Sequence, residues 1–473
     1  MNGSELADKQ VLVAGIDSGT QSVKVTVRSA VTGEMIRSGR ASHPDGSEID
    51  PKYWWDALMT AIKEAGGLED VKAISICAQQ HGMVALDSSG NVIRPALLWN
   101  DTRSAGAATA ITQEFGGAEK MAAAVGSVLV AAFTASKVRW LADNEPENAK
   151  QLAVVALPHD WLAWKLSGSK ELSDLCTDRG DASGTGYFDS VKNTYRRDIF
   201  ALALKSDREI IFPQIIGFDS FGLQTKSGIP IAAGTGDNAA AALGLDAEPG
   251  DVVVSLGTSG TAFAVSKSST SDATGEVAGF ADATGHFLPL VCTLNAARIL
   301  DAGLRILDCD FETFGLLALQ AEPGAGGLTL LPYFEGERTP NRPEATGTFS
   351  GMNLSNSTRE NIARAMIEGM LCGMADAIAS LERQGVEVKR ILLIGGAAKS
   401  SAVSQIASAI FGREVLVPPA GEYVADGAAK QAAWALLGKR PIWNLGEVKS
   451  IKSVATPEVL VKYRELRDQT EGW

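Results

Sequence analysis

Apolar and polar positions form a strand-rich pattern at the start of the chain. Residues 11–17 are an apolar run that ends in a turn, residues 23–27 alternate apolar and polar side chains, and a third strand-like run follows. This spacing predicts an antiparallel meander at the edge of a sheet. Asp50 then caps a helix that begins at Pro51, and residues 71–77 read as another buried strand. The order strand, strand, strand, helix, strand predicts a mixed α/β domain whose last strand runs parallel to the first.

The second half of the chain opens with the same pattern. Residues 252–265 contain an apolar run, the turn Gly257-Thr-Ser-Gly-Thr261 and a second apolar run, which repeat the strand, Gly-Thr turn and strand of residues 11–27. The identity between the two copies is low, so chance similarity is the alternative to a duplication. At 473 residues the chain is too long for one ordinary core, and no low-complexity segment separates its halves. We therefore expect two duplicated domains, residues 1–246 and 247–473, that meet at a hinge.

Two other segments have a readable pattern. Residues 167–195 are polar and glycine-rich, and we expect them to form a long loop or a hairpin near a site. Ser357-Thr-Arg-Glu360 has the spacing of a capping box, which predicts the start of a long amphipathic helix that runs to about Arg383.

The charge balance narrows the classes of partner. The net charge is −13 and there is no basic patch, which argues against nucleic acid and anionic membranes as partners. Five cysteines are scattered without a Cys-x-x-Cys pair, as expected of reduced thiols in the cytoplasm. The first ten residues lack the apolar segment of a signal peptide, and no apolar stretch is long enough to span a membrane. We therefore expect a cytoplasmic protein.

The middle of the chain carries the first candidate chemistry. Asp237 and Asn238 follow a glycine turn, and the turn Gly257-Thr-Ser-Gly-Thr261 comes shortly after them. A carboxylate can take the proton of a hydroxyl, and a turn rich in backbone N–H groups can hold phosphates. These are the features that phosphoryl transfer to an alcohol requires. Residues 234–239 also fit the dinucleotide pattern GxGxxA, but the next strand does not end in a carboxylate, which argues against NAD.

A similar turn follows the first strand. Asp17 ends that strand and is followed by Gly19, Thr20 and, four residues later, Lys24. Asp17 could hold a hydrated Mg²⁺, while the turn amides and hydroxyls could bind phosphate oxygens. Taken alone, each turn is also consistent with an ordinary hairpin. Two such turns in one chain, each after an apolar strand, favour a phosphate clamp across a cleft.

Three further segments are candidates for binding. Gly395-Gly-Ala-Ala-Lys-Ser400 joins a strand to a helix and could hold a nucleotide, although it lacks the glycine that a Walker A loop has before its lysine. Gln80 and His81 follow a buried strand, where ligands of α/β proteins bind, and the alternative is a structural histidine. Trp99-Asn-Asp-Thr-Arg103 predicts a sugar-contacting strip that includes Asp101, or a loop anchored by its tryptophan.

In their order along the chain, these segments resemble the carbohydrate kinases of the FGGY family, which have the actin-like ATPase fold of the ribonuclease-H type. The matching segments are Gly15-Ile-Asp-Ser-Gly-Thr-Gln-Ser-Val-Lys24, Gln79-Gln-His-Gly82, Leu98-Trp-Asn-Asp-Thr-Arg103, Phe133-Thr-Ala-Ser-Lys137, Asp181-Ala-Ser-Gly-Thr185, Gly236-Asp-Asn-Ala-Ala240, Ser255-Leu-Gly-Thr-Ser-Gly260, Pro332-Tyr-Phe-Glu-Gly-Glu-Arg-Thr-Pro340 and Gly395-Gly-Ala-Ala-Lys-Ser400. The resemblance covers nearly the whole chain and implies an α/β protein with two duplicated domains and a central cleft.

The resemblance also implies roles for individual residues. Asp237 would be the general base, and Asp17 would organise Mg²⁺. The sugar would be held by Gln80, His81, Asp237 and Asn238, to which we add Trp99 and Asp101 from the strip described above. ATP would bind with its phosphates along Gly19, Thr20, Lys24, Gly257 and Thr258 and its adenosine beside Gly395, Gly396, Ala397 and Ser400.

On this basis we expect a kinase that uses ATP and Mg²⁺ to phosphorylate a ketopentose, with D-xylulose as the first candidate. The alternatives are a sister kinase for ribulose, another pentulose, a polyol or gluconate, and a non-catalytic actin-fold protein that senses a sugar or a nucleotide. Three departures put the sugar and the nucleotide in question. The adenosine turn has Ala397 where many relatives have a third glycine, His159 stands where lysine is common, and residues 174–181 are unusually charged. Members of the family often dimerise, so a homodimer is among the expectations.

Overall fold

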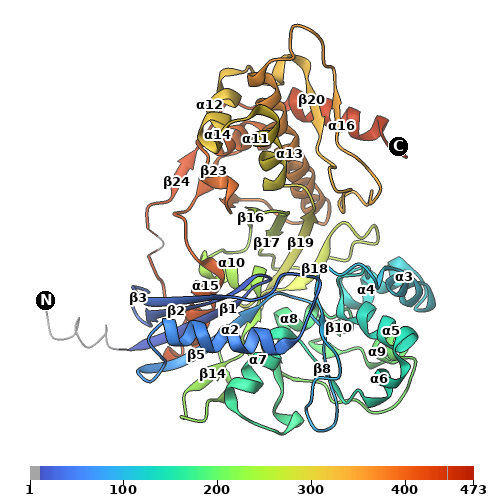
Figure 1. The fold of residues 1–473 in the computed structure, drawn as a ribbon, viewed down its shortest axis with the longest axis vertical. Coiled ribbons are helices and arrows are strands. Elements are labelled where there is room, and N and C mark those ends of the chain that lie inside the picture. The colour runs from blue at the N-terminus through green and yellow to red at the C-terminus, as the bar shows by residue number, and fades with distance from the viewer. Residues whose placement is uncertain (1–10, 445, 473) are drawn as a thin grey trace, which may run out of the picture. The chain divides into compact units, whose positions relative to one another are not determined.

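The computed structural model describes residues 11–444 and 446–472 (Figure 1). The first ten residues, in which the sequence predicts no signal peptide, lie outside this range. The chain forms two compact units. Unit 1 comprises the residues up to Ala247, Lys267–Leu288 and Glu422–Asn444, and unit 2 comprises Glu248–Ser266, Pro289–Gly421 and the residues after Asn444. A division at residue 246 assigns the two later segments of unit 1 to the second domain, whereas their contacts join them to unit 1.

The sheet of unit 1 begins with the antiparallel meander that the sequence predicts. Its strands are β1 (Leu12–Ser18), β2 (Ser22–Ser29) and β3 (Met35–Ser42), and β5 (Val71–Ala78) lies parallel to β1 on its other side. Every residue of β1 is buried, as expected of a central strand that is covered on both faces. The sheet continues beyond β5 with β14 (Pro230–Ala232) and β13 (Phe221–Gln224), and β15 (Thr235–Gly236) pairs in parallel with the end of β5.

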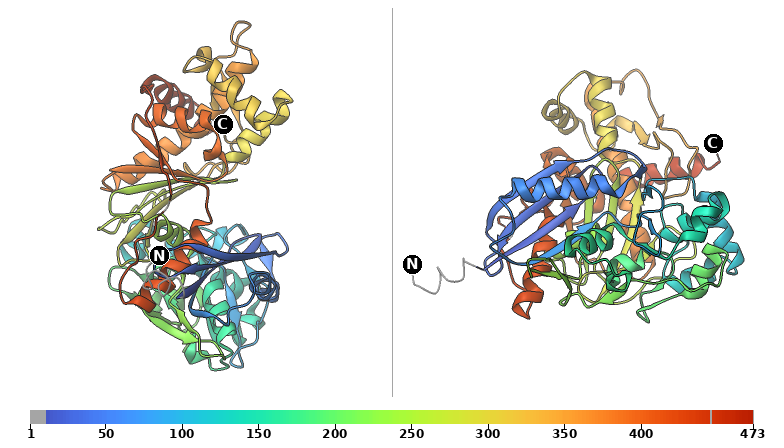
Figure 2. Two further views of the ribbon diagram at one scale, coloured as in Figure 1. Left: turned by 90° about the vertical axis from the view of Figure 1, so that its left-hand side faces the viewer. Right: turned by 60° about the horizontal axis from the view of Figure 1, so that its bottom comes forward.

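Helices cover both faces of this sheet. α2 (Pro51–Glu64) begins at the predicted residue, with the Asp50 side chain as its N-cap. Ile16 of β1 packs in the same hydrophobic cluster as the buried side of α2, whereas Val13 points to the opposite face and packs against α15 (Tyr423–Leu437). Figure 2 shows α2 lying across the strands of the meander.

The remaining elements of unit 1 surround this sheet. The helices are α3 (Ala105–Glu114), α4 (Ala118–Val125), α5 (Thr134–Asn144), α6 (Pro146–Gln151), α7 (Pro158–Ser167), α8 (Arg179–Ser183), α9 (Arg197–Leu204) and α10 (Asp237–Gly244). The short strands are β4 (Glu48–Ile49), β6 (Val84–Leu86), β7 (Ala96–Leu97), β8 (Val154–Ala156), β9 (Cys176–Asp178), β10 (Phe188–Asp189), β11 (Thr194–Tyr195), β12 (Gln214–Ile216) and β18 (Ala278–Ala281).

Residues 167–195, expected to be a loop or a hairpin, are more ordered than that. The hairpin is present as β10 and β11, but β9 pairs in parallel with β12 and leads directly into α8. The Asp178 side chain caps α8 by accepting hydrogen bonds from the backbone N–H groups of Gly180 and Asp181. Most of this segment is buried. Its polar residues satisfy buried backbone groups, which the polar, glycine-rich composition that suggested a loop or a hairpin does not reveal.

Unit 2 repeats the plan of unit 1. Its sheet has the order β19-β17-β16-β22-β23-β24, in which β19, β17 and β16 form an antiparallel meander and β22 runs parallel to β16. The strands are β16 (Asp251–Leu256), β17 (Gly260–Ala264), β19 (Phe287–Thr293), β22 (Arg390–Ile394), β23 (Val415–Val417) and β24 (Lys449–Ile451). This is the order β3-β2-β1-β5 of unit 1, so the predicted duplication is confirmed.

Helices also pack around the sheet of unit 2. They are α11 (Ala297–Leu307), α12 (Phe311–Gln320), α13 (Arg359–Arg383), α14 (Ser401–Phe411) and α16 (Pro457–Gln469), beside the short strands β20 (Thr329–Leu331) and β21 (Thr348–Ser350). α13 ends at Arg383 as predicted, but its N-cap is Thr358, whose hydroxyl accepts a hydrogen bond from the Asn361 backbone. The capping residue is therefore one position later than the first residue of the predicted capping box.

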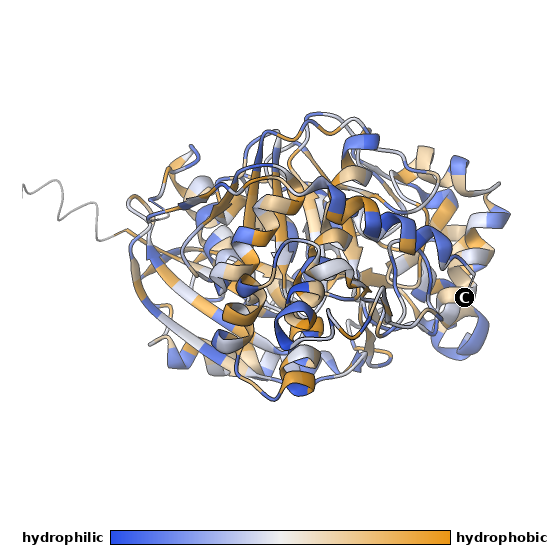
Figure 3. Ribbon diagram, turned by 90° about the horizontal axis from the view of Figure 1, so that it is seen from above, coloured by the Kyte–Doolittle hydropathy of each residue, from blue (hydrophilic) through white to orange (hydrophobic). Residues whose placement is uncertain are grey.

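The helices carry both hydrophobic and hydrophilic residues, as Figure 3 shows. None of those in the described part of the chain is long and apolar enough to cross a membrane.

Small residues bring α15 close to β1 and α10. A side chain at Gly15 would overlap the Ala425 carbonyl oxygen and the Ala429 nitrogen of α15, and a side chain at Gly427 would overlap the backbone of Ala240 in α10. These glycines let backbones approach where any larger residue would separate the elements.

We predict that Gly15→Ala lowers the free energy of unfolding by about 3 kcal/mol, because the added methyl group overpacks the contact between β1 and α15. Gly106→Ala is the matched control, since a Cβ at this exposed position in α3 meets no atom within 4 Å among the residues described. Alanine should stabilise that helix by up to about 1 kcal/mol. Urea unfolding followed by circular dichroism measures both changes, and equal stabilities for the two variants would contradict this account of the packing.

Candidate active site

Three parallel strands of unit 1 end at the same edge of the sheet. Asp17 lies near the end of β1, Gln80 and His81 follow β5, and Asp237 follows β15 directly. β5 pairs in parallel with both β1 and β15, so the chain leaves all three strands on one side. Ligands of α/β proteins bind at such carboxyl-terminal edges. The structure therefore brings together four of the residues that the sequence singled out.

Asp17 is buried and lies in a field of mixed charge. Only 7% of the residue is exposed, and burial is the main reason why its pKa rises to about 7. Lys24 Nζ lies 3.8 Å from the Asp17 carboxylate and lowers the pKa, whereas the negative charge of Asp237 raises it. The two carboxylates are thus close enough to sense each other. Lys24 also forms an ion pair of 2.5 Å with Glu422.

Asp237 is the first residue of α10. Burial raises its pKa to about 6, and hydrogen bonds from Asn238 act in the opposite direction. The Asn238 backbone N–H donates to Asp237 Oδ1 over 2.8 Å, and the Asn238 side-chain amide donates to the same oxygen over 2.9 Å. Asn238 thereby fixes the carboxylate while leaving its second oxygen, Oδ2, without either of these bonds.

Gln80 and His81 are held by the segment around α8. Gln80 Nε2 donates to the Gly180 carbonyl over 3.2 Å, and His81 Nδ1 lies 2.6 Å from the Gly184 carbonyl. His81 has a φ of 73°, a strained value for a residue with a side chain. Such strain persists where the surrounding structure fixes the residue, and it is common at functional sites.

Trp99 and Asp101 have partners within the protein. Trp99 Nε1 donates to the Thr20 hydroxyl over 3.0 Å, so the predicted sugar strip and the first phosphate turn are in contact. Asp101 is 4% exposed and accepts hydrogen bonds from Ser47 Oγ and Arg103 Nε. Burial acts to raise its pKa, but these bonds outweigh it and hold the pKa below its ordinary value. Among the described residues, no hydrogen bond or ion pair joins Asp101 to Asp17 or Asp237.

A buried polar cluster beneath Asp237 was not predicted as part of the site. It consists of His159, Asp160, Asp178 and Asp181. The charged character of residues 174–181 and the unusual histidine are visible in the sequence, but nothing in the spacing shows that α7 and α8 meet. The sequence signal that could have located this cluster is Asp178, which stands at the N-cap position of α8. In the structure its carboxylate also accepts a hydrogen bond from the Thr235 hydroxyl in β15.

The two glycine turns of unit 2 follow parallel neighbouring strands, as the candidate residues of unit 1 do. β16 and β22 are parallel neighbours, and the turn at Gly257 and Thr258 and the turn that begins at Gly395 follow them. Gly395 has a φ of 96°, and a Cβ there would lie 2.5 Å from the Leu256 carbonyl oxygen. The chain therefore needs glycine at this position to bring the two turns together.

The unit 2 turns also offer space for a ligand. A Cβ at Gly396 would meet no atom within 4 Å among the described residues, and Thr258 is exposed. Ala397 begins a 3₁₀ turn, and the Ser400 hydroxyl caps α14 by accepting from the Val403 N–H. Exposed backbone beside a helix N-terminus suits the close approach of a nucleotide.

The carboxylate of Asp17 is a ligand of the kind that a hard cation prefers, and two residues at the ends of β1 and β5 have unpartnered polar groups. Ser18 Oγ and both side-chain atoms of Gln79 are buried and have no hydrogen-bond partner among the described residues. Ser18 and Gln79 lie at the ends of adjacent strands, where the Gln79 N–H donates to the Ser18 carbonyl. Ser18 directly follows Asp17 in the strand, so its side chain points to the opposite face and the fit to Mg²⁺ depends on the Asp17 carboxylate, with water completing the shell.

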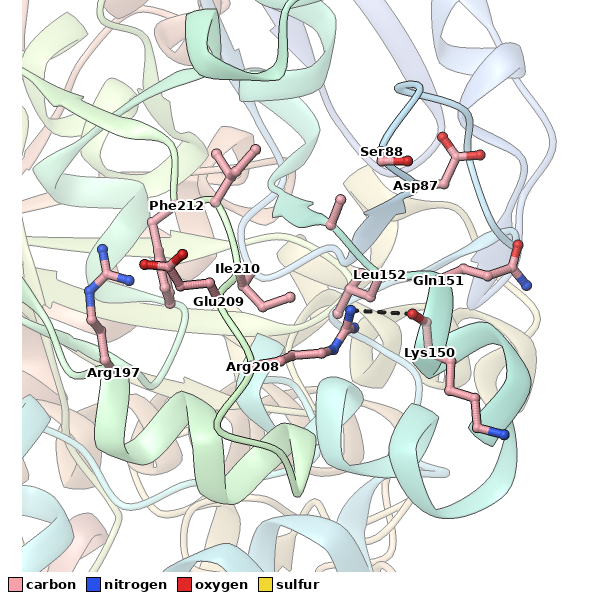
Figure 4. A pocket seen from close by; sticks show the side chains of 12 residues that line it. Asp87, Ser88, Lys150, Gln151, Leu152, Arg197, Arg208, Glu209, Ile210 and Phe212 are labelled. Atoms are coloured by element: carbon pink, nitrogen blue, oxygen red, sulfur yellow. Dashed lines mark hydrogen bonds between the residues drawn. The ribbon is translucent and has the colours of Figure 1, made fainter.

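A hollow of about 740 Å³ on unit 1 contains none of the predicted site residues (Figure 4). Arg208 in its wall donates hydrogen bonds to the carbonyls of Ala149 and Lys150, so its guanidinium group ties two segments together. The hollow therefore supplies no alternative site with the donors and carboxylates described above.

Known proteins share both the sequence and the fold. Xylulose kinase of Streptomyces coelicolor is 43% identical over 440 residues, which are 90% of this chain and 89% of that protein. The crystal structure of xylulose kinase from Bifidobacterium adolescentis is 46% identical, with a TM-score of 0.90 over 97% of this chain and 99% of that chain. A gluconate kinase from Lactobacillus acidophilus has a TM-score of 0.84 at 23% identity over 97% of this chain and 96% of that chain, which shows a shared fold alone.

The family itself follows from matches to both of its domains. Residues 12–244 match the N-terminal domain of the FGGY family of carbohydrate kinases, and residues 252–436 match its C-terminal domain. Together with the duplicated sheets, these matches identify the expected two-domain fold of the actin-like ATPase type. The chain belongs to the FGGY family of carbohydrate kinases.

Proposed function

We propose that the protein transfers the γ-phosphate of ATP to D-xylulose and produces D-xylulose 5-phosphate. The observation that carries this proposal is the position of Asp237, a carboxylate of raised pKa at the edge where three strands end. The choice of sugar is supported by the relatives named xylulose kinase, which match along most of the chain.

In this proposal Asp237 is the general base. Its raised pKa of about 6 makes it a stronger base than an ordinary aspartate while leaving it ionised at neutral pH. Both hydrogen bonds from Asn238 reach Oδ1. We therefore assign the proton of the attacking hydroxyl to Oδ2, as the oxygen of that hydroxyl forms its bond to the γ-phosphorus and ADP leaves.

The sugar contacts that we propose lie at the same edge. Gln80, His81 and Asn238 surround the turn that carries Asp237, and they offer amide and imidazole groups to sugar hydroxyls. Trp99 and Asp101 would complete the contacts from the neighbouring strip. Since Asp101 already binds Ser47 and Arg103, we assign it the role of shaping the strip rather than that of donating charge to the sugar.

We assign the metal to Asp17 and the phosphates to the turn after β1. Mg²⁺ bound with the nucleotide would neutralise phosphate charge. Asp17 would hold the hydrated ion through its buried carboxylate. Gly19, Thr20 and Lys24 follow on the same turn and strand, and they would contribute the N–H, hydroxyl and ammonium groups that phosphates bind.

The nucleotide-binding residues that we propose in unit 2 are Gly257, Thr258, Gly395, Gly396, Ala397 and Ser400. Their exposed turns and the N-terminus of α14 support this assignment. Ala397 is buried and its methyl group occupies space beside the turn, so we expect this residue to affect nucleotide affinity rather than the reaction itself.

We also propose that the enzyme works in the cytoplasm, where ATP is available. The five cysteines, all within the described residues, form no disulfide bond, which suits a reducing compartment. A homodimer stays a prediction, as do the sister substrates ribulose, another pentulose, a polyol and gluconate.

We predict that Asp237→Asn lowers kcat by about a thousandfold, because asparagine cannot accept the hydroxyl proton. The measurement couples ADP release to a panel of D-xylulose, D- and L-ribulose, L-xylulose, glycerol, xylitol and gluconate. Wild-type protein should give its highest kcat/KM with D-xylulose. The exposed Asp207→Asn on unit 1 is the control and should retain full activity.

Each alternative predicts a different result on this panel. A higher kcat/KM for another sugar would keep the mechanism and reject D-xylulose. A wild-type protein that releases no ADP with any sugar would reject the kinase proposal and favour a sensor. An active Asp237→Asn would reject the assignment of the base.

The pH dependence should follow the two carboxylates at the edge. The base works only when ionised, so kcat/KM should rise as pH increases through about 6, where Asp237 loses its proton. Asp17 loses its proton near pH 7, so binding of Mg²⁺ should strengthen over the same range. A profile from pH 5 to 8.5 checks this, and half-maximal kcat/KM near pH 4, the value for an exposed aspartate, would contradict it.

We predict that Asp17→Asn raises the Mg²⁺ concentration for half-maximal activity by about tenfold or more, because the metal loses its charged ligand. The assay varies Mg²⁺ at fixed ATP and sugar. An unchanged Mg²⁺ requirement at unchanged folding would remove Asp17 from the metal site.

A further inference from the structure

Four titratable side chains are buried together in unit 1, under the turn that leads to Asp237. They are His159 and Asp160 at the start of α7 and Asp178 and Asp181 around α8, and none is more than 2% exposed. No lysine or arginine of the described chain forms an ion pair with any of the three carboxylates. Among the described residues His159 is the basic side chain in contact with these carboxylates, whereas Arg179 on α8 acts on Asp178 only through space.

Both ring nitrogens of His159 face oxygen atoms. Nδ1 lies 2.9 Å from Asp181 Oδ2 and 3.1 Å from Asp160 Oδ1. Nε2 lies 3.3 Å from the Ala233 carbonyl oxygen and 3.9 Å from Asp178 Oδ1. A carbonyl oxygen only accepts, so Nε2 must carry the proton for this contact to be a hydrogen bond.

The contact between Nδ1 and Asp181 then needs a second proton, whichever of the two atoms carries it. A neutral imidazole has one N–H, so without the second proton a lone pair on Nδ1 would face a carboxylate. If the single N–H moved to Nδ1, a lone pair on Nε2 would face the Ala233 carbonyl instead. Loss of one proton from the cluster therefore turns one of the two contacts of His159 from attractive to repulsive.

These contacts position the turn between β14 and β15. Gly234 has a φ of 76°, and a Cβ there would overlap the His159 ring and the Ile76 carbonyl oxygen, so the turn rests directly on His159. The Thr235 hydroxyl donates to Asp178 over 2.9 Å. The next residues are Gly236 and Asp237. Two contacts of the turn, from the Ala233 carbonyl and the Thr235 hydroxyl, thus end in the cluster, while Gln431 of α15 bonds to both backbone groups of Gly234.

Two observations connect the cluster to Asp237 itself. Asp181 Oδ1 is buried without a hydrogen-bond partner among the described residues, and it lies 3.3 Å from the Cβ that a side chain at Gly236 would have. The negative charge of Asp237 also raises the pKa of Asp181, after the larger effect of burial. Protonation of the cluster and the charge of Asp237 are therefore coupled through space as well as through the turn.

We propose that His159 is a positioning residue for Asp237. His159 holds the Ala233–Gly236 turn in its active geometry only while a proton lies between His159 Nδ1 and Asp181. At alkaline pH this proton passes to solvent base, the turn shifts, and kcat falls. The inference rests on the proposed role of Asp237 as the base.

The other titratable groups near His159 do not change charge in the alkaline range, so the fall in kcat is assigned to the cluster. Burial raises the pKa of Cys77 at the end of β5, of Cys176 in β9 to about 12, and of Tyr187 and Tyr195, so all four stay neutral up to pH 9. α2 and β13, which also pack against α7, present no buried charge to it. Asp237, at about 6, is already ionised before the alkaline range begins.

Burial raises the pKa of all three carboxyls of the cluster, and that of Asp181 well above its ordinary value. Burial, opposed by His159, raises the pKa of Asp160 to about 7 and that of Asp178 to about 6. These shifts agree with the geometry, because three carboxylates and one imidazole buried together cannot all be deprotonated without leaving uncompensated charge in the core.

The test compares kcat from pH 6 to 10 at saturating ATP and sugar in wild type, His159→Lys, His159→Gln and His286→Gln. Lysine stays cationic, so His159→Lys should move the alkaline decline upward by at least one pH unit. Glutamine can donate on one side only, so His159→Gln should lower kcat at least tenfold at every pH and lack the decline, with KM for ATP unchanged. The control His286→Gln changes a histidine outside the cluster and should match wild type.

A second readout does not depend on activity. The chain has four histidines, so the ring N–H groups of His159 can be assigned in ¹⁵N NMR spectra by their absence in His159→Gln. At pH 7 we expect a slowly exchanging Nε2–H and a second proton shared by Nδ1 and Asp181, and the second should disappear as kcat falls.

The outcomes separate this inference from the proposed function. The inference is overturned if His159 carries a single unshared N–H at pH 7, or if wild type and His159→Lys share one alkaline decline. Absence of phosphorylation with every sugar would reject the proposed function, while the NMR result would still decide whether the cluster holds its proton.

Discussion

The register of three parallel strands in unit 1 is the constraint on which the candidate site depends. Asp17 in β1 lies opposite Cys77 in β5, and Cys77 also lies opposite Thr235 in β15. The ladder hydrogen bonds between these strands therefore set the distance between Asp17 and Asp237, which are far apart in the sequence. A shift of one residue would turn the side chains of a strand to the other face and separate the two carboxylates. Asp237, the proposed base, is thus placed by a rigid sheet rather than by a mobile loop.

This arrangement concentrates acidic groups in a buried place, which costs stability. Burial raises the pKa of Asp17, Asp160, Asp178, Asp181 and Asp237 above the value of an exposed aspartate. A raised carboxyl pKa in the folded state favours folding most below about pH 4, and this contribution is lost as pH rises towards 7. The site must therefore be held by packing, and the close contacts of α15 with β1 and α10 supply it. Such a trade between stability and function is common at active sites.

Strand order and turn positions could be predicted because they are local patterns. The meander, the cap at Asp50, the parallel β5 and the duplication all follow from the spacing of apolar and polar residues. The cluster around His159 could not be predicted in the same way, since His159 and Asp181 meet only after α7 and α8 pack together. Asp178 illustrates the difficulty, because a polar residue in a glycine-rich segment suggests a loop or a hairpin, whereas in the structure it caps a buried helix. The sequence also could not show that Asp101 is already bound by Ser47 and Arg103, because Ser47 comes close to Asp101 only in the folded chain.

The duplicated sheets diverge at the residues that matter for charge. The turn after β1 and the turn after β16 both contain Gly-Thr, and Asp17 stands two residues before the first pair where Ser255 stands before the second. Unit 1 therefore gathers carboxylates at its strand ends, whereas the corresponding turns of unit 2 offer backbone N–H groups and hydroxyls. A carboxylate can bind a metal and remove a proton, but it repels phosphate, and neutral donors do the reverse. Divergence at this one position accordingly gives unit 1 a carboxylate for the proposed metal, beside the turn proposed to bind phosphates, and leaves neutral donors alone at the corresponding turn of unit 2.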